Sequence, residues 1–442
     1  MRARWLLTVG FAGAVMADPV SSVAYAIESA LIRLDGDAAA LGVSMTAVVF
    51  VIALVAMSYW QIVGLFPDGG GSAEAAGAEF GTRWTFLPLG ALVVDFVLTI
   101  AISVTAATSA LASWIPRVHD WSIPITWGLL VVVALLVASG GRGRLLLAAM
   151  TVAFVLASIV VVLAGLPLEA AGQPIKDVAQ LRDSGSDLVG IIVAMSAAMA
   201  LATGIEAPAS AIAEVGHLDA DGRRRLGRTA LVATVVVVGV LTLALTLLVV
   251  HQGAGLPPDG QTLLAATVRD ALGSGVLLGG FQLTTALLLL AAAGSSLQAG
   301  PGLAKALSRA HDGVEVPLLP RWFGRSTRDG VPWIGVVVFS VVAAVLVAVA
   351  GANEQTLVVF YAVAVFVGFA FGIAAMLRYN LRSGRRAAAS LNALGLVAVV
   401  GTLALNVSRI DPIASLAAAL VVAAVIDARW RRLGRPEIHR LR

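Results

Sequence analysis

Long apolar runs recur along almost the whole sequence, and they restrict its fold more than any other feature. An α-helix needs about 17–25 apolar residues to cross a bilayer, and twelve runs approach or exceed that length. They centre on residues 8–33, 42–65, 86–113, 123–139, 145–165, 187–214, 229–251, 275–299, 332–350, 356–377, 388–406 and 411–427. Because lipid cannot satisfy an open backbone, these runs predict an all-α polytopic membrane protein with about twelve transmembrane helices.

The composition supports the same class of protein. Hydrophobic residues make up 59% of the 442 residues, and the mean hydropathy of +0.94 is too high for a soluble domain. The sequence contains no cysteine, which excludes disulfides and thiolate metal sites. The first apolar run follows a basic start but is too long for a cleavable signal, so we expect it to be the first transmembrane helix.

Basic residues indicate the orientation in the membrane. With the N-terminus inside, the outer loops hold few of the 30 basic residues, namely Arg33, Arg117, Lys176, Arg182, Arg269 and Arg409. This asymmetry predicts a plasma (inner) membrane protein with both termini in the cytoplasm. Residues 428–442 are then a short basic cytoplasmic tail, and we expect no cytosolic regulatory domain beyond it.

The middle of the first run carries a carboxylate followed by a proline. The stretch reads Asp18-Pro19-Val20-Ser21-Ser22-Val23-Ala24-Tyr25. A carboxylate at the centre of a bilayer costs roughly 3 kcal/mol or more, so it marks a functional site by default. Proline favours a break in the helix, and broken helices are tolerated where they line a cavity. Tyr25 either joins this site or is an interfacial tyrosine.

The sixth run repeats this arrangement. Residues 187–215 contain Thr203, Gly204 and Glu206, followed by Pro208 and Ser210. Interrupted helices in corresponding positions of two halves point to the site of an inverted-repeat transporter. Gly204 permits unusual dihedral angles that turn carbonyls toward a ligand. We expect Glu206 to carry a coupling proton, with Asp18 as a second proton-coupling candidate.

The third run presents Asp95, Thr99 and Ser103 at i, i+4 and i+8, which lie on one face of a helix. The carboxylate and hydroxyl oxygens of these side chains suit a hard monovalent cation. Hydroxyl groups in membrane helices also often hydrogen-bond to backbone carbonyls of their own helix. The spans hold acids, including Glu28, but no lysine or arginine clearly inside. This pattern favours a cation or proton pathway.

The connecting segments add two expectations. Residues 67–72 are rich in glycine and are predicted to be too flexible for a helix. Residues 262–272 are amphipathic and predict a lid helix on the outer side. We find no phosphate loop, nucleophile motif or metal-ligand spacing, so the sequence indicates a transporter rather than an enzyme or a sensor.

Over nearly its full length the sequence resembles the amino acid–polyamine–organocation (APC) superfamily of secondary transporters. The resemblance is carried by the first broken run, by Pro67-Asp68-Gly69-Gly70-Gly71, by Thr203-Gly204-Ile205-Glu206, by Leu319-Pro320-Arg321 and by Tyr361-Ala362-Val363-Ala364-Val365-Phe366. It implies a LeuT-like 5+5 inverted repeat, with core halves at about residues 5–165 and 187–379. Two further helices follow at about 388–427, and the whole chain of residues 1–442 forms a single domain.

Within the superfamily, the first motif is most similar to proton-coupled potassium importers of the KUP and KimA kind. That resemblance implies ion contacts from Asp18, Tyr25, Thr99, Ser103, Thr203 and Glu206, with Ser21, Ser22 and Gly204 in the same motifs. Phe96 departs from the pattern, because those importers have a tyrosine there.

The sequence therefore predicts proton-coupled uptake of a cation, potassium, with an amino acid or polyamine permease of the same fold as the alternative. No cofactor is expected, since protons and potassium are transported ions. The expected partners are the bilayer and the small cation or amino acid, without nucleic acid, and the assembly is a monomer or a homodimer.

Overall fold

The computed structural model describes residues 2–139, 143–167, 188–212, 215, 218–258, 260–308, 317–327, 330–407 and 413–435. Every regular element in these ranges is helical. Ten spans are long and apolar enough to cross a membrane, and two shorter apolar helices, Ser122–Ala138 and Trp333–Val349, complete the set. The predicted all-α polytopic class is confirmed. Part of the predicted tail, residues 436–442, lies outside the described residues.

Each predicted run corresponds to helical structure. The long helices are α1 (Arg2–Arg33), α2 (Ala38–Leu65), α4 (Phe86–Ala112), α6 (Ser122–Ala138), α7 (Gly143–Gly165), α10 (Ala220–Gln252), α12 (Val276–Leu307), α13 (Trp333–Val349), α14 (Glu354–Arg382), α15 (Arg386–Val407) and α16 (Ile413–Arg432). The sixth run is divided into α8 (Leu188–Ala198), a 3₁₀ turn η3 (Met199–Ala202) and α9 (Ala207–Ala211). Shorter elements are α3 (Gly71–Phe80), η1 (Thr82–Thr85), α5 (Arg117–Asp120), α11 (Leu263–Leu272) and η5 (Arg321–Gly324).

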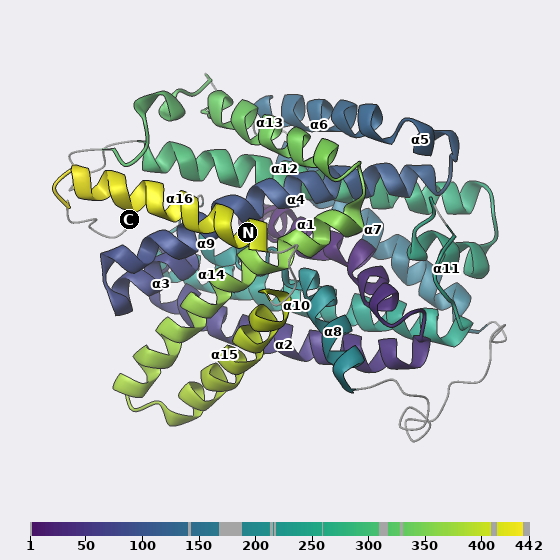
Figure 1. Cartoon of the computed structure of the whole chain (residues 1–442), viewed down its shortest axis with the longest axis horizontal. Coiled ribbons are helices and arrows are strands. Elements are labelled where there is room, and N and C mark those ends of the chain that lie inside the picture. The colour runs from purple at the N-terminus through teal and green to yellow at the C-terminus, as the bar shows by residue number, and fades with distance from the viewer. Residues whose placement is uncertain are drawn as a thin grey trace.

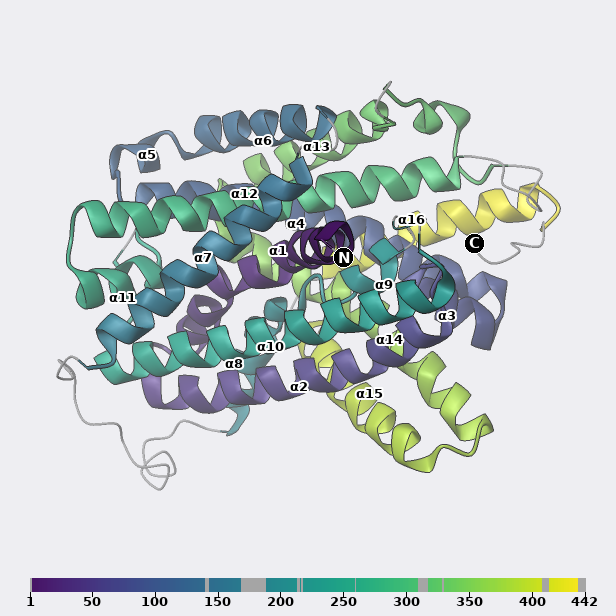
Figure 2. The same cartoon turned by 180° about the vertical axis from the view of Figure 1, so that it is seen from behind.

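α1 lies at the centre of the bundle, where it packs against α7, α8, α10 and α12 (Figures 1 and 2). Its spanning window is 89% buried inside the protein, whereas the windows of α15 and α16 are only 28% and 22% buried. The two last helices are therefore peripheral, and α15 projects from one edge in both views. A polar group in the middle of α1 is held away from lipid.

The predicted break of the first helix at Pro19 is wrong as a matter of secondary structure, because α1 is helical on both sides of this residue and through it. A proline removes one backbone hydrogen bond, but a helix packed on all sides can absorb this loss as a bend. Val15, Val20 and Val23 are buried around it and hold both halves in place. The ribbon of α1 changes direction along its length in Figure 1.

The two expectations for connecting segments have different outcomes. The predicted helix at residues 262–272 is present as α11, and its role as an outer lid stays a prediction. α11 begins after Thr262, whose side chain accepts a hydrogen bond from the amide of Ala265. The prediction that residues 67–72 are too flexible for a helix is wrong at its end, because Gly71 and Ser72 form the first turn of α3. α3 packs against α14, so tertiary contacts stabilise a stretch with weak local preference.

The cysteine-free chain allows a direct test of its orientation. Asp120 lies in α5 and Ser383 in the turn after α14, and both are exposed. We expect a membrane-impermeant maleimide to label Asp120→Cys on intact cells, and to label Ser383→Cys only after permeabilisation. The opposite pattern would contradict the cytoplasmic termini, and the unsubstituted chain is the control for background labelling.

Candidate functional site

The break in the sixth run, predicted from sequence, is confirmed at Thr203 and Gly204. Thr203 leaves the helical region with φ −52° and ψ 139°, and Gly204 follows with φ +69°. Residues with a side chain rarely adopt this left-handed conformation, so glycine suits the position. The Thr203 hydroxyl donates to the Ala200 carbonyl. The break therefore lies within a segment whose neighbours, including Ala202 and Ile205, are fully buried.

The Asp18 carboxylate of α1 lies directly against this break. A Cβ atom added to Gly204 would be 2.8 Å from Asp18 Oδ2 and 2.8 Å from Pro19 Cδ. The Asp18 side chain is only 6% exposed, and its Oδ1 has no hydrogen-bond partner within the described residues. Sequence reasoning expected the first and sixth runs to share a site, and the structure brings the two motifs together.

The hydroxyl groups of the first motif have different partners. Ser21 donates to the Asp18 carbonyl at 2.7 Å, within its own helix. Ser22 reaches the same carbonyl at 3.4 Å and also shares a 2.9 Å hydrogen bond with the hydroxyl of Tyr25, which lies beside the Thr203 side chain. Tyr25 is 3% exposed, so it is a buried residue of the site and not an interfacial tyrosine.

α4 contributes the predicted polar stripe. Asp95, Thr99 and Ser103 are buried, and the Ser103 Oγ has no hydrogen-bond partner in the part of the chain described. The Asp95 carboxylate acts electrostatically on Asp18 and on Glu206. Phe96 is half-buried and packs against the main apolar core, without a hydroxyl to offer.

Glu206, at the start of α9, is 8% exposed and accepts a 3.0 Å hydrogen bond from Tyr59 of α2. Sequence reasoning missed Tyr59, although the sequence has only four tyrosines and this one lies inside an apolar run. Within the described residues, no basic side chain forms an ion pair with Asp18 or Glu206. A proton or a bound cation must therefore balance any charge on these two acids.

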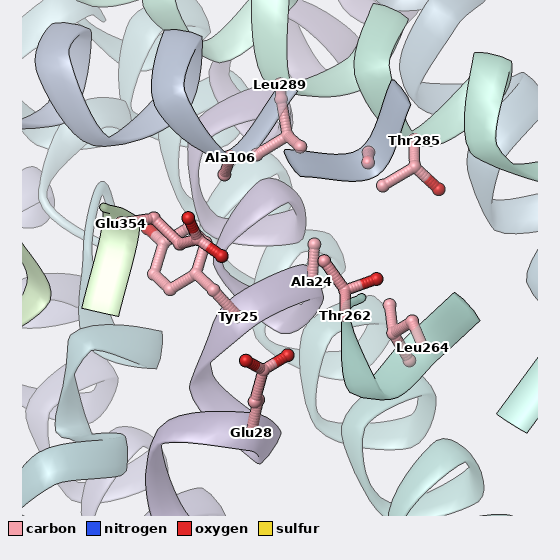
Figure 3. A pocket seen from close by; sticks show the side chains of 10 residues that line it. Ala24, Tyr25, Glu28, Ala106, Thr262, Leu264, Thr285, Leu289 and Glu354 are labelled. Carbon is pink, nitrogen blue, oxygen red and sulfur yellow. The ribbon is translucent and has the colours of Figure 1, made fainter. Parts of the chain in front are cut away.

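A second acidic pair borders a small cavity beside Tyr25 (Figure 3). Glu28 accepts a 2.8 Å hydrogen bond from the amide of Leu263 in α11, and Glu354 accepts one of 2.7 Å from Ser109. The cavity has room for about one water molecule. Sequence reasoning identified Glu28 but missed Glu354, which resembles an ordinary acid in the first turn of a helix.

A membrane-spanning bundle with a broken segment against a buried carboxylate is the arrangement of secondary transporters. The family model described as amino acid permease matches residues 6–428, and the chain belongs to this family of the APC superfamily. The potassium transporter KimA of Bacillus subtilis (strain 168) is 30% identical over 364 residues, which cover 80% of this chain and 58% of that relative. The chain thus spans less than two thirds of the relative's length. Membership of a permease family places the chain among transporters rather than enzymes.

Gly204→Ala tests the contact between Asp18 and the break. The new methyl group would meet Asp18 and Pro19 in a backbone conformation that costs about 1–2 kcal/mol for alanine. We expect the purified Gly204→Ala protein to unfold at a temperature several degrees below that of the wild type, and to lose transport. Gly190→Ala is the matched control on α8, because a Cβ there would meet no atom within 4 Å. Equal behaviour of the two variants would contradict the close approach.

Proposed function

We propose that this transporter couples protons to the uptake of a small monovalent cation, and that the cation is potassium. The observation that carries the proposal is the buried Asp18 carboxylate, whose Oδ1 has no hydrogen-bond partner within the described residues. An unsatisfied carboxylate oxygen away from water is costly. A bound cation would supply the missing partner.

The surrounding groups support a cation as the cargo. Asp95 of α4 acts electrostatically on Asp18, and Ser103, eight residues further along the same helix, has a buried Oγ without a partner where the structure describes it. Tyr25 adds a hydroxyl oxygen from α1, and Thr203 adds one from the interrupted sixth segment. Oxygen ligands of this kind suit a hard cation, as they do in other protein sites for such ions. The name of the KimA relative, a potassium transporter, agrees with this choice.

Glu206 is the proposed carrier of the coupling proton. It is buried near Asp18 and Asp95, so the three acids cannot all be ionised without a large electrostatic cost. A proton on Glu206 and a cation are carried inward together. With the site open to the cytoplasm, the bound cation favours loss of the Glu206 proton to that side, and Glu206 takes its next proton from outside after the cation has left and the empty carrier has turned outward. The mechanism is alternating access, with the inverted-repeat halves moving around the α1 and α8–α9 segments, and with both termini in the cytoplasm.

An amino acid or polyamine permease is the second candidate function, and the description of the matching family favours it. A cationic organic substrate would use the same acids. Phe96 also bears on this choice, because it places an aromatic ring where the resembling potassium importers have a phenol. Substrate identity is therefore the first property to measure.

Growth complementation tests the potassium proposal. In a bacterium without its own potassium importers, we expect the wild-type chain to restore growth at low potassium. Asp18→Asn should raise the required potassium concentration about tenfold or more, since loss of the charge removes at least 1.4 kcal/mol of cation binding. Asp120→Asn, an exposed acid on α5, is the matched control and should rescue normally. No rescue by a well-expressed wild type would contradict potassium and favour an organic substrate.

Glu206→Gln tests the proton-coupling role. In proteoliposomes, we expect accumulation driven by a pH gradient to disappear, because the amide cannot release a proton. Exchange of labelled cargo across the membrane at equal pH should persist, because it needs no net proton transfer. Accumulation at the wild-type level would remove Glu206 from this role.

A further inference from the structure

A row of buried oxygens leads from Glu206 toward one end of the bundle. The Tyr59 hydroxyl donates to Glu206 Oε2 at 3.0 Å, and the Ser72 side chain lies beside the same hydroxyl. Tyr59 is completely buried, and Ser72 is 7% exposed in the first turn of α3. Three oxygen-bearing groups, from the start of α9, from α2 and from α3, thus lie next to one another.

The facing surface of α14 places glycines against the Glu206 and Ser72 side chains, and Phe369 against the Tyr59 ring. A Cβ atom added to Gly368 would be 3.6 Å from Glu206 Oε2 and 3.8 Å from Ser72 Oγ. A Cβ atom added to Gly372, one turn further on, would be 3.0 Å from Ser72 Cβ. Glu206 and Ser72, at the two ends of the row, therefore both lie close to glycines of α14, and this proximity does not depend on the hydrogen bonds.

The row has a direction relative to the membrane. α3 follows α2 at the end of the bundle that the basic residues predict to be cytoplasmic. The turn before α3 reaches the surface, where Asp68 pairs with Arg223 at 2.5 Å. The proposed cation ligand Asp18 lies on α1, against the break that precedes Glu206. Glu206 therefore lies between two groups: Asp18 of α1, on the side of the proposed cation site, and Tyr59, on the side of α3.

We propose that Tyr59 and Ser72 carry the coupling proton between Glu206 and the cytoplasm. This inference rests on the proposed function, in which Glu206 binds that proton. Protonated Glu206 donates its proton to Tyr59 Oη while the Tyr59 proton moves to Ser72 Oγ, and the Ser72 proton passes to water beside α3. Each hydroxyl gains one proton and loses one, so only Glu206 ends deprotonated. Rotation of the two hydroxyls then restores the bond from Tyr59 to the Glu206 carboxylate.

The groups around Glu206 favour release in this direction. Asp95 faces it from α4, and Asp18 acts on it from α1, while Tyr59 and Ser72 approach from α2 and α3. A cation held by the two acids neutralises them and stabilises the Glu206 carboxylate. Proton release through Tyr59 is thereby tied to the presence of cargo.

Tyr59→Phe is the decisive variant, because it removes only the hydroxyl. The ring, which contacts Phe369 edge-on with centroids 5.7 Å apart, can stay in place. In proteoliposomes with an internal pH indicator, we expect proton flux and pH-driven cargo uptake to fall about tenfold or more, the range of a lost proton-transfer group. Cargo exchange at equal pH should stay within about twofold of wild type. Ser72→Ala should act in the same direction.

Tyr379→Phe is the matched control, since Tyr379 is a half-buried tyrosine of α14 with Arg385 over its ring. It should leave proton flux and exchange unchanged. Wild-type proton flux in Tyr59→Phe would overturn the relay and leave the proposed function intact. Loss of exchange together with proton flux in a folded, monodisperse Tyr59→Phe protein would assign a positioning role instead and overturn the relay. A wild-type protein that moves no protons with potassium, amino acids or polyamines would overturn the proposed function and the relay with it.

Discussion

The cost of burying carboxyl groups without basic partners is the constraint on which the rest of this structure depends. Asp18, Asp95 and Glu206 are 6%, 3% and 8% exposed in the middle of a helical bundle. Each charge removed from water must be balanced by a proton, a cation or hydrogen bonds. Asp95 and Glu206 both act on Asp18, so the number of positive charges in the site governs all three together. On the proposed function, this shared electrostatic balance couples the binding of the cation to the binding and release of the proton.

The backbone is adapted to the same group of acids. Gly204 lacks a Cβ that would collide with Asp18, and its φ of +69° ends the helical segment beside the carboxylate. α1 remains helical through Pro19, so its polar residues keep their positions relative to one another. One motif therefore supplies side chains from a bent but continuous helix, and the other supplies a true interruption. The two halves of the predicted symmetry differ in this respect.

Much of the fold could be predicted because it is local in sequence. The length of the apolar runs predicted the spanning helices that the structure describes, and Gly204 with its polar neighbours predicted the interruption of the sixth run. The errors arise where tertiary packing outweighs local preference, as at Pro19 and at Gly71, which begins a helix held against α14. Tyr59 and Glu354 were missed for a related reason. Their importance comes from contacts 147 and 245 residues away in sequence, which no local pattern encodes.

The cavity beside Tyr25 and the row from Glu206 to Ser72 lie on different sides of the proposed cation site. Tyr25 borders the cavity and also lies beside the side chain of Thr203, three residues before Glu206. The cavity has room for about one water, and the bond from Leu263 to Glu28 keeps α11 over it, so on the proposed orientation the approach from outside is covered by α11. To open that side, α11 must release Glu28, which then lies near Glu354 without its amide donor. A carboxylate without its donor is least costly when a proton or an entering cation arrives at the same time. On the proposed function, opening of this side would therefore depend on the arrival of positive charge, by the same rule that governs Asp18 and Glu206 in the interior.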